Sequence, residues 1–131
     1  MRFAPDRGTG GPCRFDNSAT CLRVELEGSL RRLGVDHVAL FYIHRREADR
    51  SVEEVVQTLQ NLIAEGRIGG YGLSEVSPGT LRRARAIHPC REVQNEYALG
   101  TRQPEPGMVQ TCTALDTAFV AFSPLARGAL A

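Results

Sequence analysis

The sequence has no long apolar run, little net charge and no cysteine pair with metal-binding or redox spacing. Without about 20 consecutive apolar residues, it offers no candidate membrane-spanning helix. A formal net charge of +1 predicts no strong attraction to nucleic acid or to anionic lipid. The first residues, Met1 to Asp6, lack the apolar core of a signal peptide. We therefore expect a cytoplasmic protein that binds neither nucleic acid nor a membrane.

The four cysteines and three histidines indicate no metal site. The cysteines, at positions 13, 21, 90 and 112, lack the spacing of a zinc knuckle. The histidines fall at the start of a predicted strand, the end of a strand and the end of a helix. Cys112 lies within a helical pattern, where a small buried thiol is the usual interpretation. We expect reduced thiols, as in most cytoplasmic proteins, with a disulfide as the alternative.

The N-terminal residues 1–17 are interpreted as an irregular loop segment, because they are rich in Gly, Pro and Asp and show no periodicity. Gly8-Thr9-Gly10-Gly11 is similar to a glycine-rich phosphate loop. However, no Lys-Ser or Lys-Thr follows it, and no buried strand of useful length precedes it. A plain loop is therefore favoured over a phosphate site.

From residue 18 onward, helical and extended patterns alternate. Leucines at positions 22, 26, 30 and 33 predict one inward helix face, and Gly34 ends that helix. Predicted strands cover residues 38–43, 68–76, 92–98 and 118–123, and predicted helices follow Ser51, Ser77 and Gly107. Strands that alternate with helices predict parallel pairing through right-handed crossovers. The predicted fold class is α/β, with about four parallel strands and intervening helices.

Two local patterns carry more specific expectations. Ser51 and Glu54 have the spacing of a capping box, in which the serine binds a free backbone N–H and the glutamate reaches back. Gly69, Gly70 and Gly72 lie inside a predicted strand. Glycines there often mark a close approach of a ligand or of another backbone.

Polar side chains gather where the four predicted strands end. They are His44 and Arg45, Ser74 and Glu75, Gln94, Asn95 and Tyr97, and Ser123. Parallel strands would bring them to one rim, where α/β enzymes carry their chemistry. Each also has a structural interpretation, because His44 can cap a strand and Gln94 can satisfy loop backbone. Their recurrence at successive strands points to a functional site.

Five segments, in order and with similar spacing, resemble consecutive blocks of the aldo-keto reductases. They are residues 29–36, 41–45, 70–75, 93–97 and 120–128. The resemblance covers residues 18–131 and implies one domain there. It implies a (β/α)8 TIM barrel that binds NADPH and reduces aldehydes and ketones. The strands of this chain would be the fourth to seventh of eight, which makes the fold a partial barrel, incomplete at both ends.

The resemblance also implies roles for individual residues. His44 matches the active-site histidine, which orients and polarises the substrate carbonyl. The remaining matches bind the cofactor: Ser74 and Gln94 at the nicotinamide carboxamide, Phe122 against the ring, and Ser123, Leu125 and Arg127 beside the pyrophosphate. Glu75 stands where many members have asparagine, which makes a carboxamide contact there less secure.

The proton donor of the family, a tyrosine supported by an aspartate and a lysine, comes from the first three strands. No tyrosine of this chain matches that position, since Tyr42, Tyr71 and Tyr97 match others. Arg2 would stand in place of the lysine. Arginine keeps the charge but does not lower a tyrosine pKa in the same geometry. Without the donor we expect slow or absent reduction by the isolated chain. We expect a truncated gene, an incomplete gene model or a degenerate copy.

Three functions stay open on these grounds. The first is NADP(H)-dependent reduction of a small-molecule carbonyl substrate, which leads at the level of the family. The second is a non-catalytic nucleotide-binding or regulatory role, similar to that of potassium-channel β-subunits. The third is a poorly folded chain with no function of its own. The substrate, the preference for NADP over NAD and the oligomeric state are not predicted.

Overall fold

The computed structural model describes residues 15–130, in which strands and helices alternate. The elements are α1 (Ala19–Leu33), β1 (Phe41–Ile43), α2 (Val52–Ala64), β2 (Tyr71–Ser74), α3 (Pro78–Ile87), β3 (Glu92–Glu96), α4 (Met108–Ala114), β4 (Ala118–Phe122) and a 3-10 turn η1 (Ala126–Gly128). The strands form one sheet in the order β1-β2-β3-β4, and each neighbouring pair is parallel. The predicted α/β order is confirmed.

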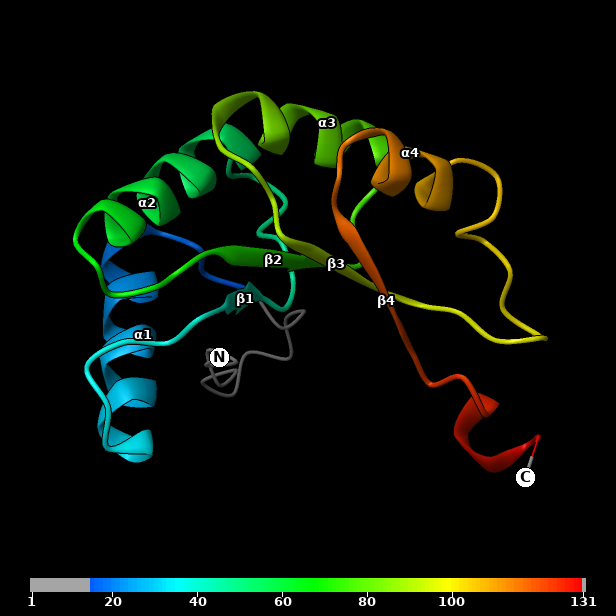
Figure 1. Ribbon diagram of the computed structural model, residues 1–131, viewed down its shortest axis with the longest axis horizontal. Coiled ribbons are helices and arrows are strands. Elements are labelled where there is room, and N and C mark those ends of the chain that lie inside the picture. Colours follow the sequence, from blue (N-terminus) through cyan, green and yellow to red (C-terminus); the bar gives the residue numbers. More distant parts are fainter. Residues whose placement is uncertain (1–14, 131) are drawn as a thin grey trace, which may run out of the picture.

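Helices α2, α3 and α4 lie along one face of this sheet, and α1 stands beside β1 (Figure 1). On the covered face, Ile43, Leu73 and Val93 follow one another across the strands and are buried. They pack with buried helix residues in one core, which includes Leu26 of α1, Val56 and Leu59 of α2, Leu81 of α3 and Met108 of α4. Each large apolar side chain buried there contributes about 1.5–3 kcal/mol.

The helix ends form largely as their sequences predict. Ser18 Oγ accepts from the Cys21 N–H at 3.2 Å, and Gly34 ends α1 in the left-handed conformation. Ser51 Oγ accepts from the Glu54 N–H at 3.2 Å. The prediction that the Glu54 side chain reaches back to the start of the helix is wrong, because the Glu54 carboxylate binds Arg50 instead. A guanidinium offers that carboxylate a stronger, charge-assisted partner than a neutral backbone N–H.

Other differences from the sequence predictions occur at the margins of elements. The first two strands are shorter than predicted, and an isolated bridge joins Val38 to Ile68 before them. At Gly69 a Cβ would lie 2.9 Å from the carbonyl oxygen of Ala39, which confirms the predicted close backbone approach. Leu33, predicted to face inward, is 65% exposed. The C-terminal end of α1 extends away from the sheet, so its last turn has little to pack against (Figure 1).

The predictions made for Arg2, Gly8 to Gly11 and Cys13 lie outside the described residues. Among residues 15–130, no helix combines the length and the apolar character needed to cross a bilayer.

Candidate active site

Strand register brings three of the predicted site residues to one level of the sheet. Ser74 pairs directly with Gln94, which pairs with Val120 of β4. His44 follows Ile43, whose partner is Leu73, and therefore lies level with Ser74. Side chains alternate between faces along a strand, and the neighbouring residues Leu73 and Val93 face the helices. His44, Ser74, Gln94 and Val120, here named the site layer, therefore belong to the opposite, open face.

The residues of the site layer differ in exposure. Ser74 is 4% exposed, Gln94 is half-buried and His44 is exposed at the carboxyl end of β1. Phe122, two residues beyond Val120, adds a half-buried aromatic ring on the same face. The arrangement therefore combines an imidazole, a hydroxyl, an amide and a ring along one rim, as predicted.

Directly next to the site layer is a second row that sequence reasoning missed. Tyr42 pairs with Gly72, Gly72 with Glu92, and Glu92 with Ala118, and these residues are here named the floor layer. The Tyr42 hydroxyl donates to the Glu92 carboxylate. Burial, reinforced by this carboxylate, raises the pKa of Tyr42 to about 12. The only signal in the sequence was Gly72, where a close approach was predicted without its partner.

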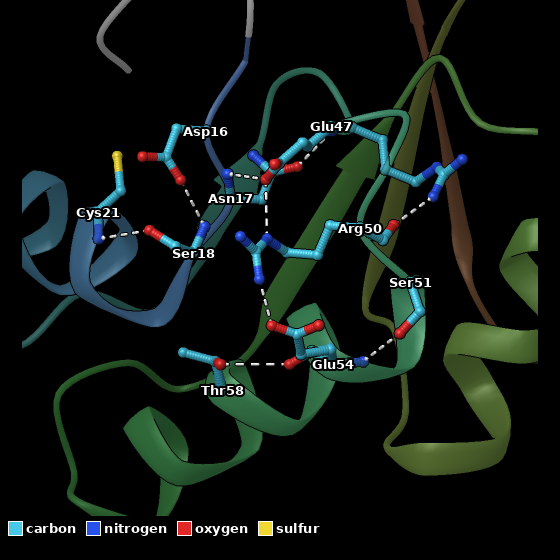
Figure 2. Close-up of polar contacts among 10 residues, drawn as sticks. Asp16, Asn17, Ser18, Cys21, Glu47, Arg50, Ser51, Glu54 and Thr58 are labelled. Carbon is cyan, nitrogen blue, oxygen red and sulfur yellow. Dashed lines mark hydrogen bonds and ion pairs between the residues drawn. The ribbon is translucent and has the colours of Figure 1, made fainter.

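The loop that follows β1 is held by a polar network around Glu47 (Figure 2). The Asn17 N–H donates to the Glu47 carboxylate at 2.9 Å, and the Glu47 N–H donates to Asn17 Oδ1 at 2.7 Å. Arg50 binds the same carboxylate at 2.8 Å and also pairs with Glu54. The Asn17 N–H, together with Arg50, holds the pKa of Glu47 below its usual range. The network therefore anchors the loop that begins at His44.

Cavities border the rim near the predicted site residues. A small one, of about 50 Å³, lies between the start of α1 and β1 and is lined by Tyr42 and His44, among others. A larger one, of about 470 Å³, lies between the loops after β2 and β3 and is lined by Glu75 and Asn95, among others. Ser74 and Gln94 do not line it. Asn95 alternates with Gln94 and so belongs to the helix-covered face, away from the site layer.

The predicted cofactor segment after β4 forms a tight turn. Ser123, Ala126 and Arg127 have φ angles of 52°, 50° and 58°, in the left-handed region that residues other than glycine seldom adopt. Such strained positions cluster at functional sites. The Arg127 guanidinium is exposed and lies 3.9 Å from the Glu96 carboxylate, and Leu125 is also exposed. The turn thus presents Ser123, Leu125 and Arg127 beyond the carboxyl end of β4.

Each tyrosine of the chain has a hydrogen-bond acceptor away from His44. Tyr42 donates to Glu92, Tyr71 donates to the His88 carbonyl at 2.8 Å, and Tyr97 donates to Glu105 at 2.8 Å. Within residues 15–130, no group of three or more His, Cys, Asp or Glu side chains is placed to hold a metal ion. The chemistry offered by the described rim is therefore hydrogen bonding and orientation by His44, Ser74 and Gln94.

Comparison with known proteins agrees with this architecture. The model of the aldo/keto reductase family matches residues 8–131. A Glycine max protein described as "Probable aldo-keto reductase 1" is 42% identical over 115 residues, which cover 88% of this chain and 33% of that protein. The glycerol dehydrogenase of Gluconobacter oxydans superposes with a TM-score of 0.83 at 29% identity, over 86% of this chain and 35% of that enzyme.

A further solved structure is the aldo/keto reductase of Klebsiella pneumoniae in complex with NADP and acetate. It has a TM-score of 0.73 at 30% identity, over 82% of this chain and 39% of that one. The open parallel sheet with helices on one face is thus part of an α/β barrel. The chain belongs to the aldo/keto reductase family. It spans about a third of the length of the relatives that it matches.

Proposed function

We propose that this chain supplies the cofactor-amide and carbonyl-orienting part of an NADP(H)-dependent reductase of small aldehydes or ketones. The observation that carries the proposal is the register pair Ser74–Gln94, with His44 level with it on the same face. A hydroxyl and an amide side by side offer both donors and acceptors. Membership of the family supports the same assignment.

The residues present fit the nicotinamide end of such a cofactor. Ser74 and Gln94 can pair with the two polar atoms of a carboxamide, and the Phe122 ring on the same face can stack against a planar heterocycle. In the turn after β4, Arg127 offers a guanidinium suited to a phosphate. The bound nucleotide would supply a hydride. Solved structures of aldo-keto reductase from Klebsiella pneumoniae are complexes with NADP and with NADPH, which supports this choice of cofactor.

His44 would act on the substrate rather than on the cofactor. Its imidazole is exposed at the end of β1, level with Ser74, and a ring N–H can donate to a carbonyl oxygen. That bond would orient the carbonyl and draw electron density toward its oxygen. The Asn17–Glu47 network would keep the loop behind it in place.

A second function, nucleotide binding without reduction, is favoured by the state of the tyrosines. All three donate to acceptors elsewhere, so none is placed to protonate a carbonyl held by His44. We expect residues 15–130 to bind NADPH without turning over an aldehyde. In that case the chain would act as a nucleotide-binding or regulatory protein.

Fluorescence titration with NADPH tests the binding site. The chain should bind, and Gln94→Ala should weaken binding about 2- to 12-fold, the effect of one lost hydrogen bond of about 0.5–1.5 kcal/mol. The control is Gln57→Ala, which removes an exposed glutamine on α2 and should leave the affinity unchanged. Absence of binding at millimolar NADPH would contradict the proposal.

NADPH oxidation in the presence of a generic aldehyde separates the two functions. We expect no turnover above the rate without protein. Clear turnover that is lost in His44→Ala would establish reduction by this chain and would rule out the purely nucleotide-binding role.

A further inference from the structure

Glu75, the residue that follows β2, has a strained backbone conformation. Its φ angle is 53°, in the left-handed region where glycine, asparagine and aspartate are the usual residues. A glutamate gains nothing from this conformation, so the contacts around it must hold it there. Those contacts are made with the end of β3.

Glu75 binds the backbone of β3 at two points. Its N–H donates to the Gln94 carbonyl at 2.9 Å, and its carboxylate accepts from the Glu96 N–H at 2.7 Å. The second bond is charge-assisted, because its acceptor is ionised. The backbone of β3 is therefore fastened to Glu75 at Gln94 and again two residues later.

The carboxylate of Glu75 takes the place of a backbone acceptor in the ladder between β2 and β3. The hydrogen bonds of a parallel pair are evenly spaced along the strands. After the Gln94 carbonyl, the next group of β3 that bonds toward β2 is the Glu96 N–H. β2 ends at Ser74, and the acceptor for this N–H is the side chain of Glu75. The ladder thus continues for one bond beyond the strand itself.

We propose that Glu75 is a positioning residue, which holds Gln94 level with Ser74, rather than a ligand of the cofactor carboxamide. This inference rests on the proposed function, in which the register pair Ser74–Gln94 binds that carboxamide. Without the bond to Glu96, the end of β3 would be free to move away from β2. A fixed separation of the two side chains lowers the entropy that is lost when one ligand pairs with both.

Three substitutions at position 75 separate the reach of the side chain from its charge. Glu75→Gln keeps the length and an acceptor oxygen but removes the charge. Glu75→Asp keeps the charge and Glu75→Asn removes it, and both are shorter by one C–C bond of about 1.5 Å. Aspartate and asparagine suit a left-handed φ, so relief of strain offsets the lost bond and the urea midpoint should stay close to that of the parent chain. The control is Asp116→Asn, which removes a carboxylate from another left-handed position, with a φ of 51°, before β4.

The first readout is the backbone amide proton of Glu96 in ¹H–¹⁵N spectra of the full chain without nucleotide. Its signal should stay close to the parent position in Glu75→Gln and Asp116→Asn, and should move upfield in the two short variants, where the N–H loses its acceptor. The second readout is the affinity for NADPH. It should keep the parent value in Glu75→Gln and fall about 2- to 12-fold in Glu75→Asp and Glu75→Asn, the effect of one ordinary hydrogen bond.

The outcomes separate this inference from the proposed function. An unmoved Glu96 signal in both short variants overturns the bond, and a moved signal with unchanged NADPH affinity overturns the positioning role. Equal changes of affinity in Glu75→Gln and Glu75→Asn, with Glu75→Asp like the parent, would show that the charge acts directly, which also overturns it. If the parent chain binds no NADPH while the Glu96 signal still moves, the proposed function fails and Glu75 only joins the two strands. If one short variant fails to fold, the other gives the same comparison with Glu75→Gln.

Discussion

The hydroxyl of Tyr71 donates to the carbonyl of His88 at 2.8 Å and so joins β2 to the end of α3. Tyr71 is fully buried in the core, and its carbonyl acceptor lies at the helix C-cap, where carbonyls lack helical partners. This bond fixes the distance between the sheet and the helix layer beside the site layer. Burial raises the pKa of the Tyr71 phenol, because the charged form is poorly solvated there.

Tyr71→Phe is expected to destabilise the chain by about 1–3 kcal/mol, since it leaves a partly buried carbonyl without its partner. The free energy of unfolding measured with urea checks this. Tyr97→Phe is the control, because its Glu105 partner lies in a loop. We expect that change to cost less than Tyr71→Phe. Equal losses of unfolding free energy would show that the Tyr71–His88 bond stabilises the fold no more than the Tyr97–Glu105 bond does.

Asn17→Ala is expected to cost about 1–3 kcal/mol of stability, because it leaves the Glu47 N–H without its acceptor near the rim. Asn17 is 3% exposed, so water cannot readily replace the lost oxygen. The urea midpoint measures the change. Gln57→Ala on the exposed side of α2 should stay within about 0.5 kcal/mol of the parent chain. A similar urea midpoint for both variants would show that the Asn17–Glu47 network does not stabilise the loop.

Acid should weaken the same network. The pKa of Glu47 is lowered from its ordinary value of 4.5, first by the Asn17 N–H and then by Arg50. The folded state therefore binds this proton less readily than the unfolded state does. Its contribution is fully present above about pH 4.5 and is lost as the pH falls through the folded pKa. Urea midpoints between neutral and acid pH should fall less steeply in Glu47→Gln than in the parent chain.

Alkali should act through Tyr42. Its pKa is raised from 10.0 to about 12, so the folded state holds the proton more tightly than the unfolded state. The associated stability is fully present below pH 10 and is lost as the pH rises toward about 12. The ultraviolet absorbance of tyrosinate should show this late titration together with that of Tyr71, and Tyr42→Phe should remove the part that belongs to Tyr42. A Tyr42 that ionises near pH 10 would contradict its bond to Glu92.

Two of the cysteines should be unreactive in the folded chain. Cys90 and Cys112 are each 2% exposed, and burial raises the pKa of Cys90 to about 12 and that of Cys112 above its usual value. Because the thiolate is the reactive form, neither should react with a thiol reagent at neutral pH until urea is added. The double variant Cys90→Ser, Cys112→Ser should lack that delayed reaction. Rapid reaction of all cysteines without urea would mean that the core is open.

Local features of the fold were predictable from the sequence because they depend on neighbouring residues. The caps at Ser18, Ser77 and Gly34 each satisfy a free backbone group within one turn of helix, and Pro78 at the first helical position has no N–H to satisfy. Leu22, Leu26 and Leu30 were predicted correctly as one buried face, but Leu33 was not. Its exposure depends on where the sheet ends, which helical periodicity does not encode.

The candidate site was predictable only in part, because it depends on contacts between strands as well as on neighbouring residues. His44, Ser74 and Gln94 were recognised because each lies near the end of its own strand. That they share one layer, and that Asn95 faces the other way, follows from the pairing register. Their roles in binding and orientation stay predictions.

By itself, the sequence determined the order of strands and helices, the helix ends and the residues at the strand ends, because these follow from local backbone preferences and hydrophobic periodicity. The tertiary structure decided which side chains meet across the sheet. Tyr42 and Glu92 are 50 positions apart, and Asn17 and Glu47 are 30 apart. Their contacts exist because parallel crossovers return the chain in a particular register, and that register is set by the packing of the whole core against its helices.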